Sequence, residues 1–368
     1  MDRDQSRQVE PPHTRLPHVL ATLYGLAIVY ASLEPFSPWL APAQGTPFFL
    51  FAPSSVRWTR YDAVLNVLAY APFGFFVALL SRGASPARRI GASLAIGAAM
   101  SFAMESLQMY IPPRIASPYD LATNTLGALL GGVVAALVAR NPAARAALYG
   151  ARTTLFLPGQ LGDVGLGLLA LWLVAQMNPG IPLFAVTFDA GVAPPGFPST
   201  PPDSAGAFVQ AAGSAFQVLG VGLFATLLLR RRRNVGAIVL AMILGALVLK
   251  GFAAAVMLKP ATWQAWIRPA AMIGIAVGAA LLRIAIALPR PVQVALCAIA
   301  LLSSLGAPVL APETLAGRAP VALFDWHYGQ LLNYNDLTRM ALLVWPVLTA
   351  LWLFVLAGRP AWGRPDNP

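Results

Sequence analysis

Residues 235–257 read VGAIVLAMILGALVLKGFAAAVM, and the only charged side chain in this stretch is Lys250. A helix of this length, at about 1.5 Å per residue, crosses the roughly 30 Å hydrocarbon core of a bilayer. Four consecutive arginines, 230–233, come just before it. Basic clusters flank apolar spans on the cytoplasmic side, so the stretch predicts a membrane helix that starts there.

Apolar segments of similar length recur along all 368 residues. Charged residues make up only 11% of the chain, whereas an ordinary soluble domain carries about 25%. The runs do not alternate as barrel strands do, and a spanning backbone has to satisfy its own hydrogen bonds. We therefore predict an all-α, polytopic helical membrane protein with about ten transmembrane helices. The predicted spans are 18–36, 62–80, 90–109, 119–138, 161–177, 208–229, 235–257, 269–288, 291–308 and 338–357.

The net charge of +11 comes mainly from arginines in the short connections between these segments. This distribution indicates the orientation of the helices in the membrane and argues against nucleic acid as a partner. The expected partner is therefore the lipid bilayer. With both termini in the cytoplasm, most of the 25 lysines and arginines lie on the inner side. The single cysteine, Cys297, lies in an apolar run and the chain has three histidines, so we expect no metal and no cofactor.

The chain divides into three predicted parts. A four-helix membrane module covers residues 1–140, a basic cytoplasmic linker covers 141–160, and a six-helix membrane module of unknown role covers 161–368. In the third part we expect Lys250 to snorkel to the outer interface. The polar and aromatic stretch 324–339 is either a lip that binds sugars or lipid headgroups or an interfacial belt. We expect Asn335 or Asp336 in it to cap the last helix.

Polar side chains recur at helical spacing in three of the first four predicted spans. The pairs are Asp62 with Asn66, Glu105 with Gln108, and Asp120 with Asn124. Each spacing puts both side chains on one helix face. Counted from the helix ends, Asn66, Glu105 and Asn124 lie about 6 Å inside the outer surface. Arg114 lies in the short connection at the same level, so these side chains are expected to form one group.

Two interpretations of this group remain open. In the first it is an outward-facing polar pocket, in which Arg114 binds an anionic group while Glu105 and Asp120 set the charge or move a proton. Asn66, Gln108 and Asn124 then orient the ligand. In the second, Arg114 forms a buried pair with Glu105 or Asp120, and the amides join neighbouring helices.

The same residues stand in a recognisable order. Asn66 is followed by Pro72-Phe73-Gly74, then Glu105-Ser106-Leu107-Gln108, then Arg114 after a proline pair, then Asp120-Leu121-Ala122-Thr123-Asn124 leading into Gly127 and Gly131. With this set, residues of about 20–140 resemble the VanZ-like family, whose founding member is associated with teicoplanin resistance. The resemblance implies a bacterial inner-membrane protein of the cell envelope, and the larger second module is a departure from the family.

From the pocket and the resemblance together we expect a VanZ-like envelope protein that binds or handles an amphipathic ligand. This ligand would be a lipid-linked precursor or a glycopeptide, with a link to glycopeptide tolerance. One alternative is a membrane-embedded transferase or hydrolase acting on a lipid phosphate or ester, with Glu105 or Asp120 as general base. Another is a proton-coupled flippase or transporter, so the sequence leaves open whether the protein is an enzyme.

Overall fold

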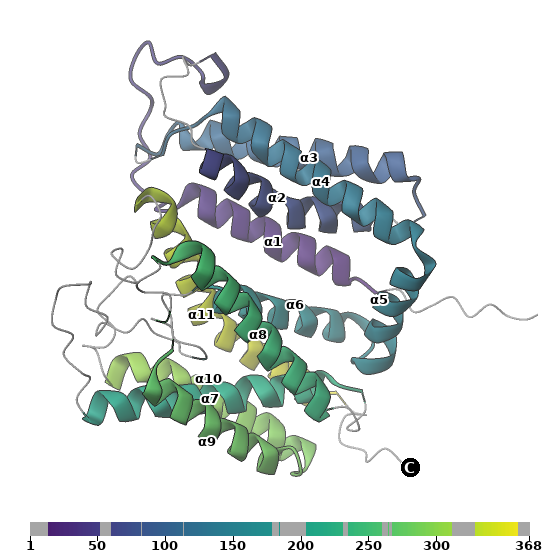
Figure 1. Ribbon diagram of the computed structural model, residues 1–368, viewed down its shortest axis with the longest axis vertical. Helices are drawn as coiled ribbons and strands as arrows, with labels where there is room; N and C mark the ends of the chain where they lie inside the picture. Colours follow the sequence, from purple (N-terminus) through teal and green to yellow (C-terminus); the bar gives the residue numbers. More distant parts are fainter. Residues whose placement is uncertain are drawn as a thin grey trace, which may run out of the picture.

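A computed structural model describes residues 14–51, 60–81, 83–112, 114–178, 184, 204–230, 235–259, 264, 267–310 and 328–359. In these ranges the chain forms eleven α-helices and one short 3-10 turn, Phe49–Phe51 (Figure 1). The α-helices are α1 (Leu16–Leu33), α2 (Arg60–Leu80), α3 (Pro86–Gln108), α4 (Pro118–Arg140), α5 (Pro142–Leu155), α6 (Gly159–Gln176), α7 (Ser204–Leu228), α8 (Val235–Met257), α9 (Pro269–Ala285), α10 (Arg290–Leu310) and α11 (Tyr328–Ala357).

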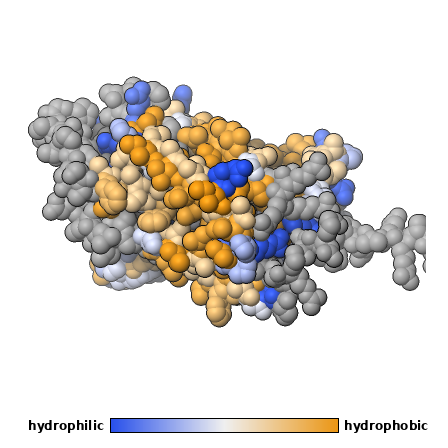
Figure 2. Space-filling model, turned by 90° about the horizontal axis from the view of Figure 1, so that it is seen from below, coloured by the Kyte–Doolittle hydropathy of each residue, from blue (hydrophilic) through white to orange (hydrophobic). Residues whose placement is uncertain are grey.

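Eight of the described helices are long and apolar enough to cross a membrane, and they are α1–α4, α6–α8 and the apolar part of α11. The helix α9 and the 290–303 part of α10 are apolar but shorter. Together these ten helices correspond to the ten predicted segments, so the all-α, polytopic fold is confirmed. Figure 2 shows one face on which apolar side chains cover much of the described surface, as helices that contact lipid require.

The helix α5 does not correspond to a predicted span. It lies across the ends of α4 and α6 rather than alongside them (Figure 1). Asn141 starts it, because its side chain accepts hydrogen bonds from the backbone N–H groups of Ala143 and Ala144 and is followed by a proline. The segment predicted as a basic linker thus contains a capped helix.

The helix α11 begins at Tyr328, ten residues before the predicted start. Asn335 and Asp336 therefore lie inside the helix, and the prediction that one of them caps it is wrong. Hydropathy does not detect the first turns of this helix because they are polar. Residues 324–327 of the predicted polar lip lie outside the described residues.

Glycines bring α2 and α4 into close contact. A Cβ atom on Gly131 would overlap the carbonyl oxygen of Ala71, and one on Gly127 would overlap that of Val67. Gly127 and Gly131, four residues apart, thus allow the close helix contact that is typical of a small-xxx-small pattern. The buried Ser93 hydroxyl of α3 lies 2.8 Å from the Gly74 carbonyl oxygen and 2.7 Å from that of Ala128, which ties α3 to both helices.

Two groups of buried apolar side chains form the interior. One lies within the first four helices and includes Tyr70, Phe73 and Met104. The other lies among α6–α11 and includes Trp172 and Trp345. The helix α1 packs against both α6 and α11, so it connects the two groups.

Candidate functional site

The polar side chains predicted on α2 and α4 contact each other directly. The Asn66 amide nitrogen donates a hydrogen bond to Asp120 Oδ1 at 2.9 Å and lies 3.3 Å from Thr123 Oγ1. Both N–H bonds of this amide are thereby used. The contact holds the start of α4 against α2, at the end of the bundle where the α3–α4 connection lies.

Glu105 is only 3% exposed and binds the beginning of α4. One of its oxygens, Oε2, accepts a hydrogen bond from the backbone N–H of Ser117 at 2.9 Å. Ser117 is the residue that caps α4, with its side chain accepting from the N–H of Tyr119. A carboxylate is favoured at the positive end of a helix dipole, so the backbone of α4 stabilises Glu105 in place of a basic side chain. Within the described part of the chain, Oε1 makes no hydrogen bond.

Asn124 is buried between α3 and α4. Its amide nitrogen donates to Ser101 Oγ at 3.0 Å, and Ser101 lies one helical turn before Glu105. The other end of the amide, Asn124 Oδ1, is buried and has no hydrogen-bond partner among the described residues. The hydroxyl of Tyr70 is also buried and lies near Ser101, but it makes no hydrogen bond of good geometry to any described residue.

We call these residues the outer polar cluster, after the side of the membrane that the sequence predicts for them: Asn66, Tyr70, Ser101, Glu105, Asp120 and Asn124. An unpaired buried polar atom costs about 1–3 kcal/mol, and native proteins seldom keep one without an ordered water or ligand. This cluster holds two such atoms, Asn124 Oδ1 and the Tyr70 hydroxyl. A group that donates or accepts hydrogen bonds between α2, α3 and α4 would satisfy them.

Sequence reasoning did not single out Tyr70 or Ser101. Tyr70 lies four residues after Asn66, and Ser101 lies four residues before Glu105. Each therefore shares a helix face with a predicted site residue, and this spacing was the available signal. Tyrosine and serine are common in membrane helices, so neither residue is conspicuous by type alone.

Arg114 and Gln108 bind α1 rather than the cluster. The Arg114 guanidinium donates from Nε to the carbonyl oxygen of Glu34 at 2.9 Å and from Nη2 to that of Ala31. The Gln108 amide nitrogen donates to the carbonyl oxygen of Ser32 at 2.9 Å. These three carbonyls lie at the C-terminal end of α1, where helical partners are missing.

The predicted structural pairing of Arg114 with a carboxylate differs from what the structure shows. Within the described residues Arg114 forms no ion pair with Glu105 or Asp120. Burial lowers the pKa of the Arg114 guanidinium, while the carboxylates of Glu34 and Glu105 favour its charged form. Arg114 is thus close enough to influence the outer polar cluster electrostatically but is anchored by backbone oxygens.

Lys250 is fully buried, and the prediction that it snorkels to the interface is wrong. Its Nζ donates to the carbonyl oxygen of Asn178 at 2.8 Å. The Asn178 side chain in turn donates to Thr338 Oγ1 at 2.7 Å, so this group joins α8, the end of α6 and α11. The packing of α8 with its neighbouring helices buries the lysine, and no sequence pattern predicts which helices these are.

A second polar network lies at the opposite, N-terminal end of α1, and we call it the inner network after the side that the sequence predicts for it. Asp163 of α6 is fully buried and accepts hydrogen bonds from Thr14 Oγ1 at 2.7 Å, the Arg15 N–H at 2.6 Å and Arg152 Nε at 2.8 Å. Arg152 also donates to the carbonyl oxygen of Leu157. This inner network joins α1, α5 and α6. Its charges are paired and its donors are used, which is typical of a structural brace.

Among the described residues there is no group of three or more histidine, cysteine, aspartate or glutamate side chains that could hold a metal ion. Glu105 and Asp120, the two carboxylates of the outer polar cluster, bind a backbone N–H and an asparagine amide instead.

Comparison with known proteins identifies a family that the N-terminal part of the chain matches. No curated protein and no solved structure has significant similarity to this chain. One family model does match, that of VanZ/LLP1, over residues 5–139. This range runs from before α1 to the last turn of α4 and includes the whole outer polar cluster. The resemblance predicted from the spaced motif is thereby confirmed, since the N-terminal module of this membrane protein matches the VanZ/LLP1 family.

Proposed function

We propose that this VanZ-like membrane protein binds an amphipathic molecule of the cell envelope, lipid-linked or glycopeptide-like, at the outer polar cluster. The observation that carries the proposal is the pair of buried, unpaired atoms, Asn124 Oδ1 and the Tyr70 hydroxyl. They lie around Glu105, whose Oε1 is also unused in the described part of the chain. Polar and ionisable groups at membrane depth are costly, so a cluster left partly unsatisfied supports a ligand site more than a brace.

The position of the cluster along the helices supports an amphipathic ligand. Glu105 lies three residues before the end of α3, and Asp120 lies two residues after the start of α4. At about 1.5 Å per residue both are within roughly 5 Å of a helix end. This is the boundary between headgroups and hydrocarbon, where a ligand can place a polar group in the cluster and an apolar part in the lipid.

Arg114 and Gln108 form the rim of the proposed site. Their side chains fix the end of α1 beside the cluster through the carbonyls of Ala31, Ser32 and Glu34. Arg114 keeps N–H bonds on Nη1 beyond those used for these carbonyls, so it is available to an anionic group of the ligand.

Complementation of a strain that lacks the protein tests this proposal. Glu105→Gln and Asn124→Leu should accumulate in the membrane at normal levels yet fail to restore glycopeptide tolerance and the normal profile of lipid-linked precursors. Arg145→Gln, at an exposed position of α5, is the matched control and should complement fully. Full complementation by both cluster variants would refute a functional site at this place.

An enzymatic role on a lipid phosphate or ester is the second candidate, and the geometry of Glu105 favours it. One carboxylate oxygen is held by the Ser117 N–H while the other is left to accept a proton, as a positioned general base requires. In this case Glu105→Gln should abolish turnover of lipid-linked precursors in reconstituted membranes while ligand binding persists.

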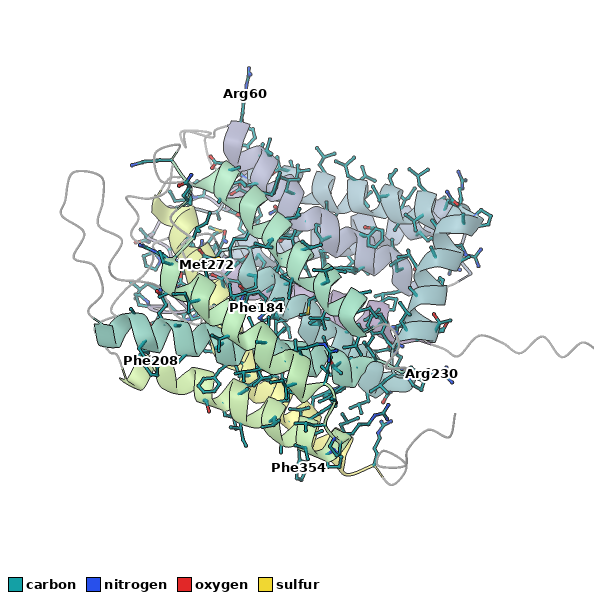
Figure 3. All side chains as sticks on the ribbon, turned by 60° about the horizontal axis from the view of Figure 1, so that its bottom comes forward. Arg60, Phe184, Phe208, Arg230, Met272 and Phe354 are labelled. Atoms are coloured by element: carbon teal, nitrogen blue, oxygen red, sulfur yellow. The ribbon has the colours of Figure 1, made fainter. Side chains whose placement is uncertain are left out.

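We further propose that the protein lies in the bacterial cytoplasmic membrane with both termini inside, and that residues 1–140, 141–160 and 161–368 are its modules and linker. Basic residues at the inner ends of α4, α5 and α7 (Arg140, Arg152 and Arg230) support this orientation. Figure 3 shows Arg230 at the opposite end of α7 from Phe208. A fluorescent protein fused to the C-terminus should fluoresce, and alkaline phosphatase fused there should be inactive; the reverse result would contradict the orientation.

A further inference from the structure

We propose that the outer polar cluster binds the primary ammonium group of a membrane lipid. This inference rests on the proposed function and names the chemical group that the site takes. It follows from which hydrogen-bonding atoms of the cluster are used and which are left.

The buried atoms of the cluster that make no hydrogen bond to a described residue are able to accept one. The Asn66 amide nitrogen is used by Asp120 and Thr123, and the Asn124 amide nitrogen donates to Ser101. The atoms left over at the buried level are Asn124 Oδ1 and the Tyr70 hydroxyl. To these the Glu105 carboxylate adds Oε1, which makes no hydrogen bond to any described residue. A group that pairs with all three as acceptors has to donate hydrogen bonds, and an ammonium group supplies three N–H bonds.

Charge distinguishes an ammonium group from a hydroxyl group. Glu105 is buried, and Asp120 is half-buried on the facing helix. Neither forms an ion pair with a basic side chain of the described residues. Buried charges are normally paired or neutralised, because an isolated charge is costly in an apolar environment. A cationic ligand pairs with these carboxylates, whereas a neutral hydroxyl does not.

The depth of the cluster in the bilayer indicates which kind of molecule carries the amine. The two carboxylates of the cluster, Glu105 and Asp120, lie within one turn of the outer ends of α3 and α4, at the level of the headgroups, and Asn124 lies about one turn deeper. Two exposed apolar side chains, Ile115 and Tyr119, lie on the chain segment beside it. A lipid with an amine headgroup can therefore reach the cluster without leaving the bilayer.

The test compares three lipids of identical acyl chains bound to the purified full-length protein, with retention measured by native mass spectrometry. Phosphatidylethanolamine carries the cation with its N–H donors, phosphatidylcholine keeps the cation but lacks the donors, and phosphatidylglycerol offers hydroxyl donors without the cation. A hydrogen bond to a charged group is worth about 1.5–3 kcal/mol, so the ethanolamine lipid should be retained about tenfold or more over the choline lipid.

Two variants assign this preference to the cluster. Glu105→Gln should reduce the preference for the ethanolamine lipid to near parity. Tyr70→Phe, which removes one hydroxyl from a position where the aromatic ring is already buried, should reduce it severalfold. Arg145→Gln should leave it unchanged, and thermal unfolding confirms that each variant is folded. If Glu105→Gln fails to fold, the comparison of lipids on the wild-type protein and on Tyr70→Phe still decides the matter.

Equal retention of the ethanolamine and choline lipids by the wild-type protein would overturn this inference, and so would equal retention of the glycerol lipid. A preference unaffected by both cluster variants would overturn it as well. The proposed function is tested separately, because complementation does not depend on which lipid is retained. Loss of complementation by Glu105→Gln without any headgroup preference would leave a functional site for another ligand.

Discussion

Arg114 joins the α3–α4 connection to the end of α1 through the carbonyl oxygens of Glu34 and Ala31. A planar guanidinium reaches both oxygens at once, and its charge is favourable at the C-terminal end of a helix. Lysine carries a single ammonium group and cannot reproduce both contacts. We therefore expect Arg114→Lys to lower the free energy of unfolding by about 1.5–3 kcal/mol, measured by denaturant titration of the purified protein in detergent.

The matched control for this residue is Arg145→Lys on α5, where the side chain is exposed and the same exchange should cost less than about 0.5 kcal/mol. An equally small effect at both positions would show that the carbonyl contacts contribute nothing to stability. Arg114 also shows how much of the surroundings of a single residue the sequence predicts. Its place beside the outer polar cluster was predicted, but its partners were not, because backbone carbonyls have no sequence signature.

At the scale of helices, the contact between α2 and α4 depends on the absence of side chains. A Cβ atom on Gly131 would overlap the Ala71 carbonyl oxygen and lie 2.7 Å from the backbone nitrogen of Phe75. Since these are backbone atoms, the two helices have to separate. Gly131→Ala should lower the free energy of unfolding by about 1–3 kcal/mol, as overpacking of a close interface does.

A matched exchange on the neighbouring helix should have the opposite sign. A Cβ atom on Gly91 of α3 meets nothing within 4 Å, so Gly91→Ala should raise stability by up to about 1 kcal/mol through helix propensity alone. Thermal melting of both variants side by side checks the pair. If Gly131→Ala melted as high as Gly91→Ala, the close contact of α2 and α4 would not exist in the folded protein.

The positions of the helices were predicted better than any other feature of this structure, because a long apolar segment has few other stable conformations in a bilayer. All ten segments are present, and their ends shift by a few residues except at α11. Its first turns contain Asn335 and Asp336, and polar residues give no hydropathy signal. The prediction that Lys250 snorkels was wrong for a related reason. The sequence shows that a lysine lies in a span, but it does not show which helices enclose the lysine.

At the scale of the whole molecule, a buried ion pair lies beside the N-terminal end of α1. Asp163 of α6 binds Arg152 after α4 and also the backbone N–H of Arg15 at the start of α1. The start of α1, which belongs to the part of the chain that matches the VanZ/LLP1 family, is thus hydrogen-bonded to α6, in addition to the packing of α1 against α6 and α11. The sequence did not predict this, because the residues involved are separated by up to 149 positions.

We expect Asp163→Asn and Arg152→Gln each to lower the free energy of unfolding by about 3–5 kcal/mol, because each leaves the other residue buried without its charge partner. The double variant Arg152→Gln/Asp163→Asn should lose less than the sum of the two, and the difference in a double-mutant cycle gives the coupling between Arg152 and Asp163. Arg145→Gln is again the exposed control. Additive effects would contradict the brace, since they would mean that the two residues act independently.

Because the brace lies at the opposite end of α1 from the outer polar cluster, its loss should reduce membrane abundance and complementation together. The cluster variants should reduce complementation alone.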